Sequence, residues 1–129
     1  MSTISRRLAI AATLATALLS APALAQELAG TLKKIKDSGV IALGHRESSI
    51  PFSYYDDKQQ VVGYSQDMML KAVEAIKAEL KLAKLDIKLV PVTSENRITL
   101  VQNGTVDLEC GSTTNTTERQ KQVSFSDSI

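Results

Sequence analysis

Tryptophan is missing from this sequence of 129 residues, which also has only one cysteine and one histidine. A structural or catalytic metal site normally needs several Cys or His side chains at a fixed spacing, so we expect no metal centre. Neither a G-x-G-x-x-G pattern nor a P-loop is present, and these are the usual sequence signs of a bound nucleotide. We therefore expect the protein to work without a cofactor.

The sequence also lacks a surplus of charge of either sign. Its formal net charge is +1, and acidic residues outnumber basic ones by one if the first 25 residues are left out. Binding to nucleic acid or to an anionic membrane surface depends on clustered Lys and Arg. The composition, 43% hydrophobic and 22% charged, is that of an ordinary globular domain. No nucleic-acid partner is expected.

Residues 1–25 have the pattern of a secretory signal peptide. Arg6 and Arg7 provide the positive charge, residues 8–21 are apolar, and an A-x-A motif stands at 23–25. The apolar run is shorter than the roughly 20 residues that span a bilayer, so cleavage after Ala25 is favoured over a membrane anchor. The arginine pair leaves the twin-arginine export route open beside the Sec route. Both routes predict a periplasmic protein.

Beyond residue 25, apolar periodicity predicts alternating helices and short strands. Helices are expected over 27–37, from a cap at Ser65 to about 81, from a cap at Ser94 to about 102, and over 118–122. Strands are expected over 40–43, 87–92 and 106–110, with a hairpin formed by 52–55 and 61–64. This order indicates an α/β fold with a mainly parallel sheet flanked by helices.

Ligands of open parallel sheets bind beyond the carboxyl ends of the strands, which here are followed by segments 44–53, 93–97 and 111–119. These segments hold the three arginines found after residue 25, whereas the ten lysines lie mostly on predicted helices and turns. A guanidinium binds a carboxylate through two parallel hydrogen bonds and keeps its charge. Several hydroxyl side chains accompany the arginines. The three arginines, Arg46, Arg97 and Arg119, are the binding residues that this pattern predicts. Together they predict a small ligand with more than one carboxylate.

Less specific interpretations exist for the same residues. Each arginine can be a surface residue in a weak ion pair with the neighbouring acid, which is Glu47, Glu95 or Glu118. Two aromatic residues, Phe52 and Tyr64, are candidates for an apolar wall of the site, although aromatic residues in strand-like runs more often belong to the core.

Four stretches of the sequence carry a family resemblance: HRESSIPFSYYD (45–56), VVGYSQD (61–67), TSENRITLVQNGTVDLECGSTTNTTERQ (93–120) and FSDSI (125–129). They resemble the periplasmic solute-binding proteins of polar amino-acid ABC importers. The resemblance implies a lobe of the type II periplasmic binding protein fold. The combination of Arg46 and Arg97 with the Cys-Gly-Ser-Thr-Thr run resembles the members that bind acidic amino acids.

The resemblance also implies roles for individual residues. Arg119, with Ser112 and Thr114, would hold the α-carboxylate and α-amino group of the ligand. Arg46 and Arg97, helped by Ser94, would hold its side-chain carboxylate. Members of the family as a rule have no catalytic residues, cofactors or metals. By resemblance we expect a monomer that is not an enzyme, binds L-glutamate or L-aspartate, and delivers it to the membrane permease subunits of an ABC importer.

Two lobes of this kind need roughly 200 or more residues at ordinary domain sizes. We therefore expect 26–129 to be a partial first lobe without its second lobe, whose isolated product binds weakly or not at all. Cys110 is then free, paired between chains, or paired with a residue outside this sequence. Two alternatives stay open. One is an enzyme of the cyclohexadienyl or arogenate dehydratase kind, with His45, Glu47 or a residue beyond Ile129 as acid or base. The other is the sensor lobe of a membrane signalling protein.

Overall fold

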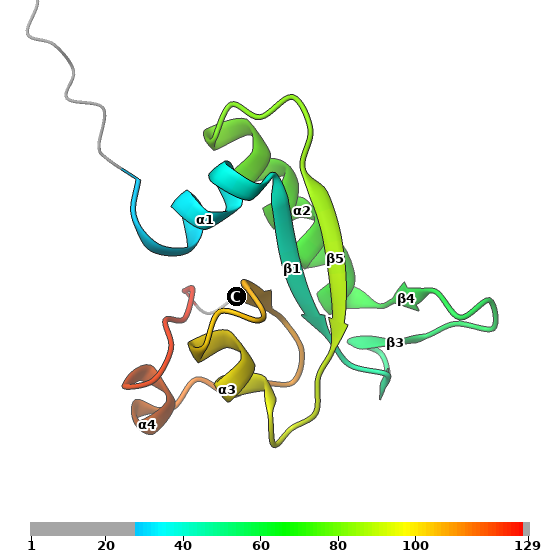
Figure 1. The fold of residues 1–129 in the computed structure, drawn as a ribbon. Helices are drawn as coiled ribbons and strands as arrows, with labels where there is room; N and C mark the ends of the chain where they lie inside the picture. Colours follow the sequence, from blue (N-terminus) through cyan, green and yellow to red (C-terminus); the bar gives the residue numbers. More distant parts are fainter. Residues whose placement is uncertain (1–27, 128–129) are drawn as a thin grey trace, which may run out of the picture.

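A computed structural model describes residues 28–127 (Figure 1). The helices are α1 (Gly30–Ser38), α2 (Tyr64–Glu79), α3 (Arg97–Gln102) and α4 (Thr117–Gln120). The strands are β1 (Val40–His45), β2 (Ser48–Ser49), β3 (Ser53–Tyr55), β4 (Val61–Val62), β5 (Asp86–Pro91) and β6 (Leu108–Glu109). This arrangement confirms the predicted α/β class. The predicted signal sequence and its cleavage site lie outside the described residues.

β1 is the central strand of a parallel sheet with the order β5-β1-β6. Leu43 of β1 lies opposite Leu89 of β5 and Leu108 of β6. Since all three strands run the same way, their carboxyl ends meet at one edge, and the arrowheads of β1 and β5 in Figure 1 point toward the side where α3 and β3 lie. β6 is shorter than predicted because the amide of Val106 donates to the carbonyl of Leu100 in α3 (2.9 Å). We call the edge where the carboxyl ends of β5, β1 and β6 meet the carboxyl edge.

α1, β1 and α2 share one hydrophobic core. It consists of Ile35, Ile41, Leu43, Met69, Val73 and Leu80, each at most 3% exposed. Full burial of an aliphatic side chain of this size contributes about 1.5–3 kcal/mol. The apolar stripe of α2 is therefore core, as its helical spacing predicts. The stripe of α1 is only partly buried, since Leu32 remains 39% exposed.

A small antiparallel sheet with the order β2-β3-β4 leaves the main sheet after β1. β3 and β4 form the predicted hairpin, and its turn is held by Asp56, whose carboxylate accepts from the amides of Lys58 and Gln60 at 2.8 Å. The short strand β2 was not predicted from the sequence, since two residues are too few to show a period. The excursion places β3 close to the carboxyl edge (Figure 1).

The start of α2 differs from the prediction. Tyr64 is the first residue of the helix and not the end of a strand, and Gly63, with φ at 117°, is the N-cap in place of Ser65. The amides of Tyr64 and Ser65 donate to the carbonyls of Pro51 (3.0 Å) and Phe52 (2.8 Å), so the helix needs no side-chain cap. A Cβ on Gly63 would lie 2.5 Å from the carbonyl oxygen of Phe52. Glycine is required there by both backbone angle and space.

The start of α3 also corrects the prediction that Ser94 is its cap. The hydroxyl of Thr93 accepts from the amides of Glu95 (3.3 Å) and Asn96 (3.2 Å), and the side chain of Asn96 accepts from the amide of Thr93 (2.8 Å). Thr93 therefore caps the turn that leads into α3, and the hydroxyl of Ser94 is left for another partner. At the other end, α3 stops at Asn103 and Gly104 as predicted, with Gly104 at φ 78°.

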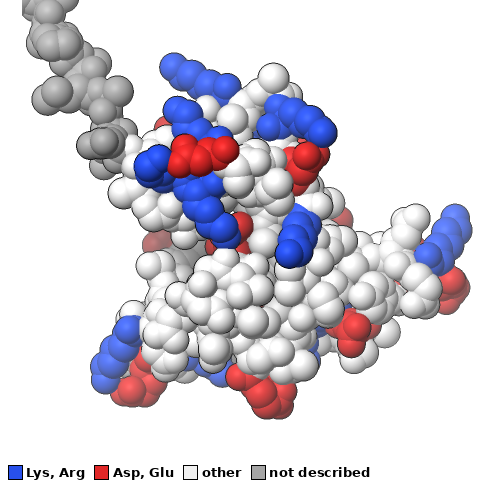
Figure 2. Space-filling view, in the orientation of Figure 1, with Lys and Arg blue, Asp and Glu red and all other residues white. Residues whose placement is uncertain are grey.

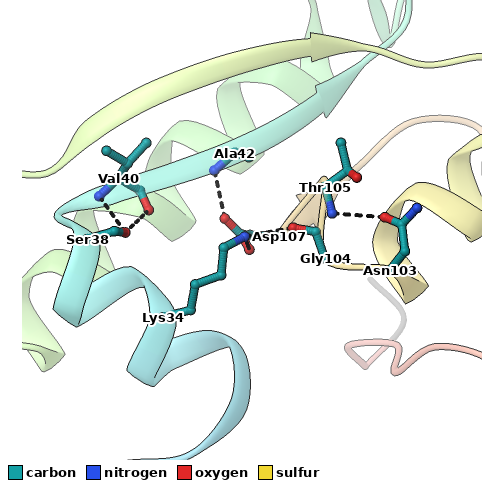
Figure 3. Close-up of polar contacts among 8 residues, drawn as sticks. All are labelled: Lys34, Ser38, Val40, Ala42, Asn103, Gly104, Thr105 and Asp107. Carbon is teal, nitrogen blue, oxygen red and sulfur yellow. Dashed lines mark hydrogen bonds and ion pairs between the residues drawn. The ribbon is translucent and has the colours of Figure 1, made fainter.

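One carboxylate ties α1, β1 and the turn after α3 together (Figure 3). Asp107, with a side chain only 3% exposed, accepts from the amide of Ala42 (2.9 Å) and forms an ion pair with Lys34 (2.8 Å). Lys34 also donates to the carbonyl of Gly104 (2.7 Å). We call these four residues the Asp107 clasp. Every charged atom in it has a partner, so it stabilises the fold.

Within residues 28–127, none of the helices combines the length and apolar character needed to cross a membrane.

Candidate ligand-binding site

The structure brings the three predicted segments together at the carboxyl edge. Arg46, which follows β1, donates from Nη1 to the hydroxyl of Ser94, which follows β5 (3.1 Å). Gly111, which follows β6, is also close, since a Cβ on it would lie 3.5 Å from Cγ of Arg46. Ser94 is available for this contact because Thr93 has taken over the capping of the turn before α3. We call the surface formed by the three segments the arginine rim.

Arg46 is held in place through its own backbone. The hydroxyl of Ser53 in β3 is completely buried, accepts from the amide of Arg46 (2.9 Å) and donates to its carbonyl (3.1 Å). Nδ1 of His45 lies 3.2 Å from the same carbonyl, and the His45 ring contacts the edge of Tyr55. The hairpin therefore fixes the position from which the Arg46 side chain extends. Sequence reasoning missed Ser53, because a serine in a strand gives no sign of what it contacts.

Arg97 is the most buried of the three rim arginines, at 5% exposure. Burial lowers its pKa, and the positive charges of Arg46 and Arg119 lower it further, whereas Glu109 and Glu95 raise it. Each of these charges is therefore within electrostatic reach of Arg97. Nε and Nη1 of Arg97 are buried and have no hydrogen-bond partner among the described residues. A guanidinium stays charged even so, and its unpartnered donors are suited to an anion.

Arg119 lies in α4, the last helix of the rim. Its Nη1 donates to the main-chain carbonyl of Thr114 (2.9 Å), and its amide donates to the hydroxyl of Thr116, the N-cap of α4 (3.3 Å). These bonds hold Arg119 against the loop before α4. Thr114 contributes its carbonyl to this contact rather than its hydroxyl. Ser112 in the same loop is exposed.

The alternative in which each arginine pairs with a neighbouring acid is wrong for this structure. The four ion pairs found within residues 28–127 all use a lysine, and Glu118 pairs with Lys121 instead of Arg119. Three of these pairs are exposed and add little stability. Figure 2 shows basic side chains (blue) next to acidic ones (red) over the part of the visible face formed by α1.

The two predicted wall residues are neighbours. Phe52 is 42% exposed and Tyr64 is 53% exposed. At the start of α2 the amide of Tyr64 donates to the carbonyl of Pro51, and the carbonyl of Phe52 accepts from the amide of Ser65. Neither side chain belongs to the core, so the core alternative is wrong for both. Exposed aromatic rings beside the segment that carries Arg46 remain candidates for contact with the apolar part of a ligand.

Sequence reasoning missed two further residues of the rim. Glu109 ends β6, and its Oε2 accepts from the hydroxyl of Thr113 (2.7 Å). Oε1 of Glu109 is buried and has no hydrogen-bond partner among the described residues. A glutamate in a predicted buried strand is itself a detectable signal, because buried Glu is rare unless it is paired. Thr113, in contrast, stands among several similar residues and cannot be singled out.

Two hollows in the surface lie beside β6 and are lined in part by Glu109 and Thr113. One of about 430 Å³ is lined by residues such as Met68, Leu108, Cys110 and Phe125, and none of the rim arginines borders it. Its lining is mostly apolar, so it does not match the anionic ligand that the rim predicts. The rim itself is an open surface, with Ser94 and Ser112 exposed. No cluster of His, Cys, Asp or Glu that could hold a metal ion occurs in the described part of the chain.

Comparison with known proteins gives a consistent result. The family described as bacterial extracellular solute-binding proteins, family 3, matches residues 41–129. The chain is 59% identical over 122 residues to the glutamate/aspartate import solute-binding protein of Escherichia coli (strain K12), which covers 95% of this chain and 39% of that protein. It is 63% identical over 111 residues to the L-glutamate/L-aspartate-binding protein of Pseudomonas aeruginosa. This alignment covers 85% of this chain and 37% of that protein. The chain therefore spans about two fifths of the length of these curated relatives.

Solved structures show the same fold. An ancestral cyclohexadienyl dehydratase aligns with a TM-score of 0.66 and 28% identity, over 78% of this chain and 39% of that one. A mutant of the arginine-bound form of domain 1 from TmArgBP aligns with a TM-score of 0.64 and 25% identity, over 74% of this chain and 69% of that one. The predicted fold, a partial α/β lobe of the periplasmic binding protein type, is confirmed.

Proposed function

The chain belongs to the bacterial extracellular solute-binding proteins of family 3, and from this membership we propose that it binds L-glutamate or L-aspartate for an ABC importer. Binding is non-covalent and takes place in the periplasm, after export through the signal peptide at 1–25. The partners of the protein are the acidic amino acid and the permease subunits in the membrane. The close relatives are binding proteins for transport and not enzymes, and we extend that property to this chain.

The observation that carries the proposal is the gathering of three arginines at one edge of the sheet without acidic partners. Arg46 is held by Ser94, Arg119 by the carbonyl of Thr114, and Arg97 is buried with free donors. Arg46 and Arg119 both repel the charge of Arg97, and an anionic ligand would offset this repulsion. A ligand with a carboxylate at each end can engage all three.

The assignment of the two ends of the ligand is the one that the family resemblance implies. Arg119, together with Ser112 and Thr114, binds the α-carboxylate and α-amino group. Arg46 and Arg97 bind the side-chain carboxylate, helped by Ser94. The Arg46–Ser94 hydrogen bond and the burial of Arg97 support this division, because they place two guanidiniums on the side of the rim formed by β1 and α3. Phe52 and Tyr64 contact the aliphatic part of the ligand.

The length of the chain bears on affinity. The rim is open, and the relatives named above are more than twice as long as this sequence. Residues 26–129 therefore form part of a first lobe, and we expect them to bind weakly alone. A mutant of domain 1 from TmArgBP has been crystallised in an arginine-bound form, so binding by residues 26–129 alone is worth measuring.

An enzymatic function on the same fold is the alternative, since an ancestral cyclohexadienyl dehydratase is a structural neighbour. Such an elimination needs an acid or base that reaches the ligand. His45 is only 2% exposed and is packed against Tyr55, which does not favour this role. Incubation with prephenate or arogenate tests the alternative, and formation of an aromatic product would support it.

Calorimetric titration tests the proposal. The protein, expressed at its natural length from its own gene and freed of bound ligand, is titrated with L-glutamate, L-aspartate, L-glutamine and L-arginine. We expect tight binding of the two acidic amino acids only. Arg119→Ala should weaken this binding by about a hundredfold, because a bidentate guanidinium–carboxylate pair is lost.

Lys121→Ala, which removes an exposed cation near the same helix, is the matched control and should bind normally. Unchanged affinity of Arg119→Ala would contradict the residue assignment. Absence of binding to both acidic amino acids would contradict the function.

A further inference from the structure

Arg46 lies at the junction of the two sheets, between neighbours whose carbonyls both have main-chain partners. The carbonyl of His45 accepts from the amide of Val92 (2.8 Å). The carbonyl of Glu47 accepts from the amide of Tyr55 (3.1 Å). Arg46 itself belongs to no strand, and within residues 28–127 neither its amide nor its carbonyl has a main-chain partner. Main-chain groups shielded from water need partners, so a side chain has to supply these bonds.

The side chain that supplies them is Ser53 of β3, which is completely buried. Its hydroxyl accepts from the amide of Arg46 (2.9 Å) and donates to the carbonyl of Arg46 (3.1 Å). One hydroxyl can serve both groups, because it donates one hydrogen bond while it accepts others. Nδ1 of His45 lies 3.2 Å from the same carbonyl, but no second acceptor for the Arg46 amide occurs within residues 28–127. Loss of the hydroxyl would therefore leave that amide unpaired.

Arg46 is thus held at both of its ends. Its main chain is bonded to Ser53, and Nη1 at the tip of its side chain donates to the hydroxyl of Ser94 (3.1 Å). An arginine side chain has many rotamers, and fixing it in one place costs conformational entropy. A defined main-chain position limits the rotamers that can reach Ser94, so the guanidinium is arranged before a ligand arrives. Ser53 is fully buried, so a ligand on the open rim does not touch it.

We propose that Ser53 is a positioning residue for the site, which holds Arg46 where its guanidinium meets the side-chain carboxylate of the ligand. This role rests on the proposed function, because it uses the assignment of Arg46 to that carboxylate. A guanidinium–carboxylate pair depends on direction as well as distance, so a displaced main chain weakens it. A misplacement of about 1 Å is enough to lose much of such an interaction.

The first experiment measures L-glutamate binding by the protein at its natural length, freed of bound ligand. Ser53→Ala removes the hydroxyl and should weaken binding by about tenfold, because Arg46 loses its fixed position. Ser48→Ala, which removes an exposed hydroxyl from β2 of the same small sheet, is the matched control and should bind within about twofold of the original protein. Unchanged binding by Ser53→Ala would overturn the proposal.

A double-mutant cycle separates the positioning of Arg46 from a general loss of structure. In a protein that already carries Arg46→Met, the guanidinium is gone, so Ser53→Ala has nothing left to misplace. The second substitution should then change the affinity for L-glutamate by less than about twofold. A further loss of about tenfold in this background would contradict the proposal, because Ser53 would then affect binding by a route other than Arg46.

A further readout needs no ligand. The Nε–H resonance of Arg46 in ¹H–¹⁵N NMR spectra reports the surroundings of its guanidinium, which include Ser94. Ser53→Ala should shift this resonance toward that of an arginine in an unfolded chain, and Ser94→Ala should shift it in the same direction. Ser48→Ala should leave it unchanged. An Arg46 resonance that stays in place in Ser53→Ala would rule out the positioning role.

Failure of the proposed function has a different signature. If the unmodified protein binds neither acidic amino acid, the function is wrong, and the NMR result alone decides whether Ser53 positions Arg46. If Ser53→Ala does not fold, Ser53→Thr and Ser53→Val replace it as a pair of equal shape that differs in the hydroxyl. Ser53→Thr should then bind L-glutamate about tenfold more tightly than Ser53→Val, and equal affinities of the pair would refute the proposal.

Discussion

Asp107 and Glu109 stand two positions apart, one just before β6 and one at its end, and their surroundings are opposite. The carboxylate of Asp107 is bonded to both Ala42 and Lys34. Among residues 28–127 the carboxylate of Glu109 has one hydrogen-bond partner, Thr113, and its other oxygen is buried without a partner. Nε and Nη1 of Arg97, which lies in electrostatic reach, are likewise buried without partners there. On one side of β6, the charged atoms of the Asp107 clasp all have partners. On the other side, one oxygen of Glu109 has none among the described residues.

The comparison teaches how to distinguish structural charges from functional ones in this fold. Removing a partner from a complete buried cluster leaves an uncompensated polar group and costs stability. A charge without a partner already carries that cost in the folded protein, so its removal relieves the fold and harms only the function that it serves. Substitutions in the Asp107 clasp should therefore lower the free energy of unfolding. Substitutions of unpartnered charges in the arginine rim should instead weaken ligand binding and leave the free energy of unfolding unchanged or higher.

The largest change in the free energy of unfolding is expected at the Asp107 clasp. Asp107→Ala should lower the free energy of unfolding by about 2–4 kcal/mol, because the buried amide of Ala42 loses its acceptor and a well-packed side chain is lost. Lys34→Met is the comparison: it leaves Oδ1 of the buried Asp107 without Lys34 but keeps the Ala42 amide on Oδ2, so it should also destabilise the protein, by about 1–2 kcal/mol, less than Asp107→Ala. Urea unfolding measures both. A cost for Asp107→Ala as small as that for Lys34→Met would break the comparison.

The second effect concerns Arg97. Arg97→Met keeps the length of the side chain and removes the charge, so the free energy of unfolding should stay the same or rise by about 1 kcal/mol. Glutamate binding should fall by about a hundredfold. Arg46→Met is the control for stability and should bring no gain, because Arg46 is only half-buried and bonded to Ser94. Loss of stability in Arg97→Met would show that its charge is structural.

The smallest effect is a dependence on pH at Glu95, an exposed acid of the rim. Its hydrogen bond with Thr93 lowers its pKa, and Arg46 and Arg97 lower it further. A carboxyl with a lowered pKa in the folded protein stabilises the fold above its unfolded pKa, and this contribution is lost as the pH falls through the folded pKa. Glu95→Gln should therefore lose slightly less stability than the original protein between neutral pH and pH values below about 4. Urea midpoints at both ends of this range measure the difference, and parallel curves for the two proteins would contradict it.

Much of the fold could be predicted from the sequence, because its signals are local and repeated. The stripe of α2 from Met69 to Leu80 has helical spacing, and it is buried in the core. The Asn103-Gly104 pair ends α3 as its preference for turns predicts. The gathering of arginines from three segments at one edge followed from the parallel order of the strands.

What could not be predicted depends on partners that are distant in sequence. Ser94 and Ser65 both look like helix caps, but Thr93 and the carbonyls of residues 51 and 52 satisfy the amides concerned. Ser53 and Asp107 are important only through contacts with Arg46 and Lys34. A single sequence shows which groups can form such bonds, and only the structure shows which bonds form.

The glycine that starts α2 has a consequence for how this protein can change over time. Gly63 lies against the Phe52 carbonyl at a distance that leaves no room for a Cβ, and every other amino acid has one. No codon change at this position is therefore conservative, whatever the polarity or size of the new residue. In a library of all single replacements, position 63 should tolerate fewer amino acids than the rim arginines, whose replacement alters binding but leaves the chain able to fold.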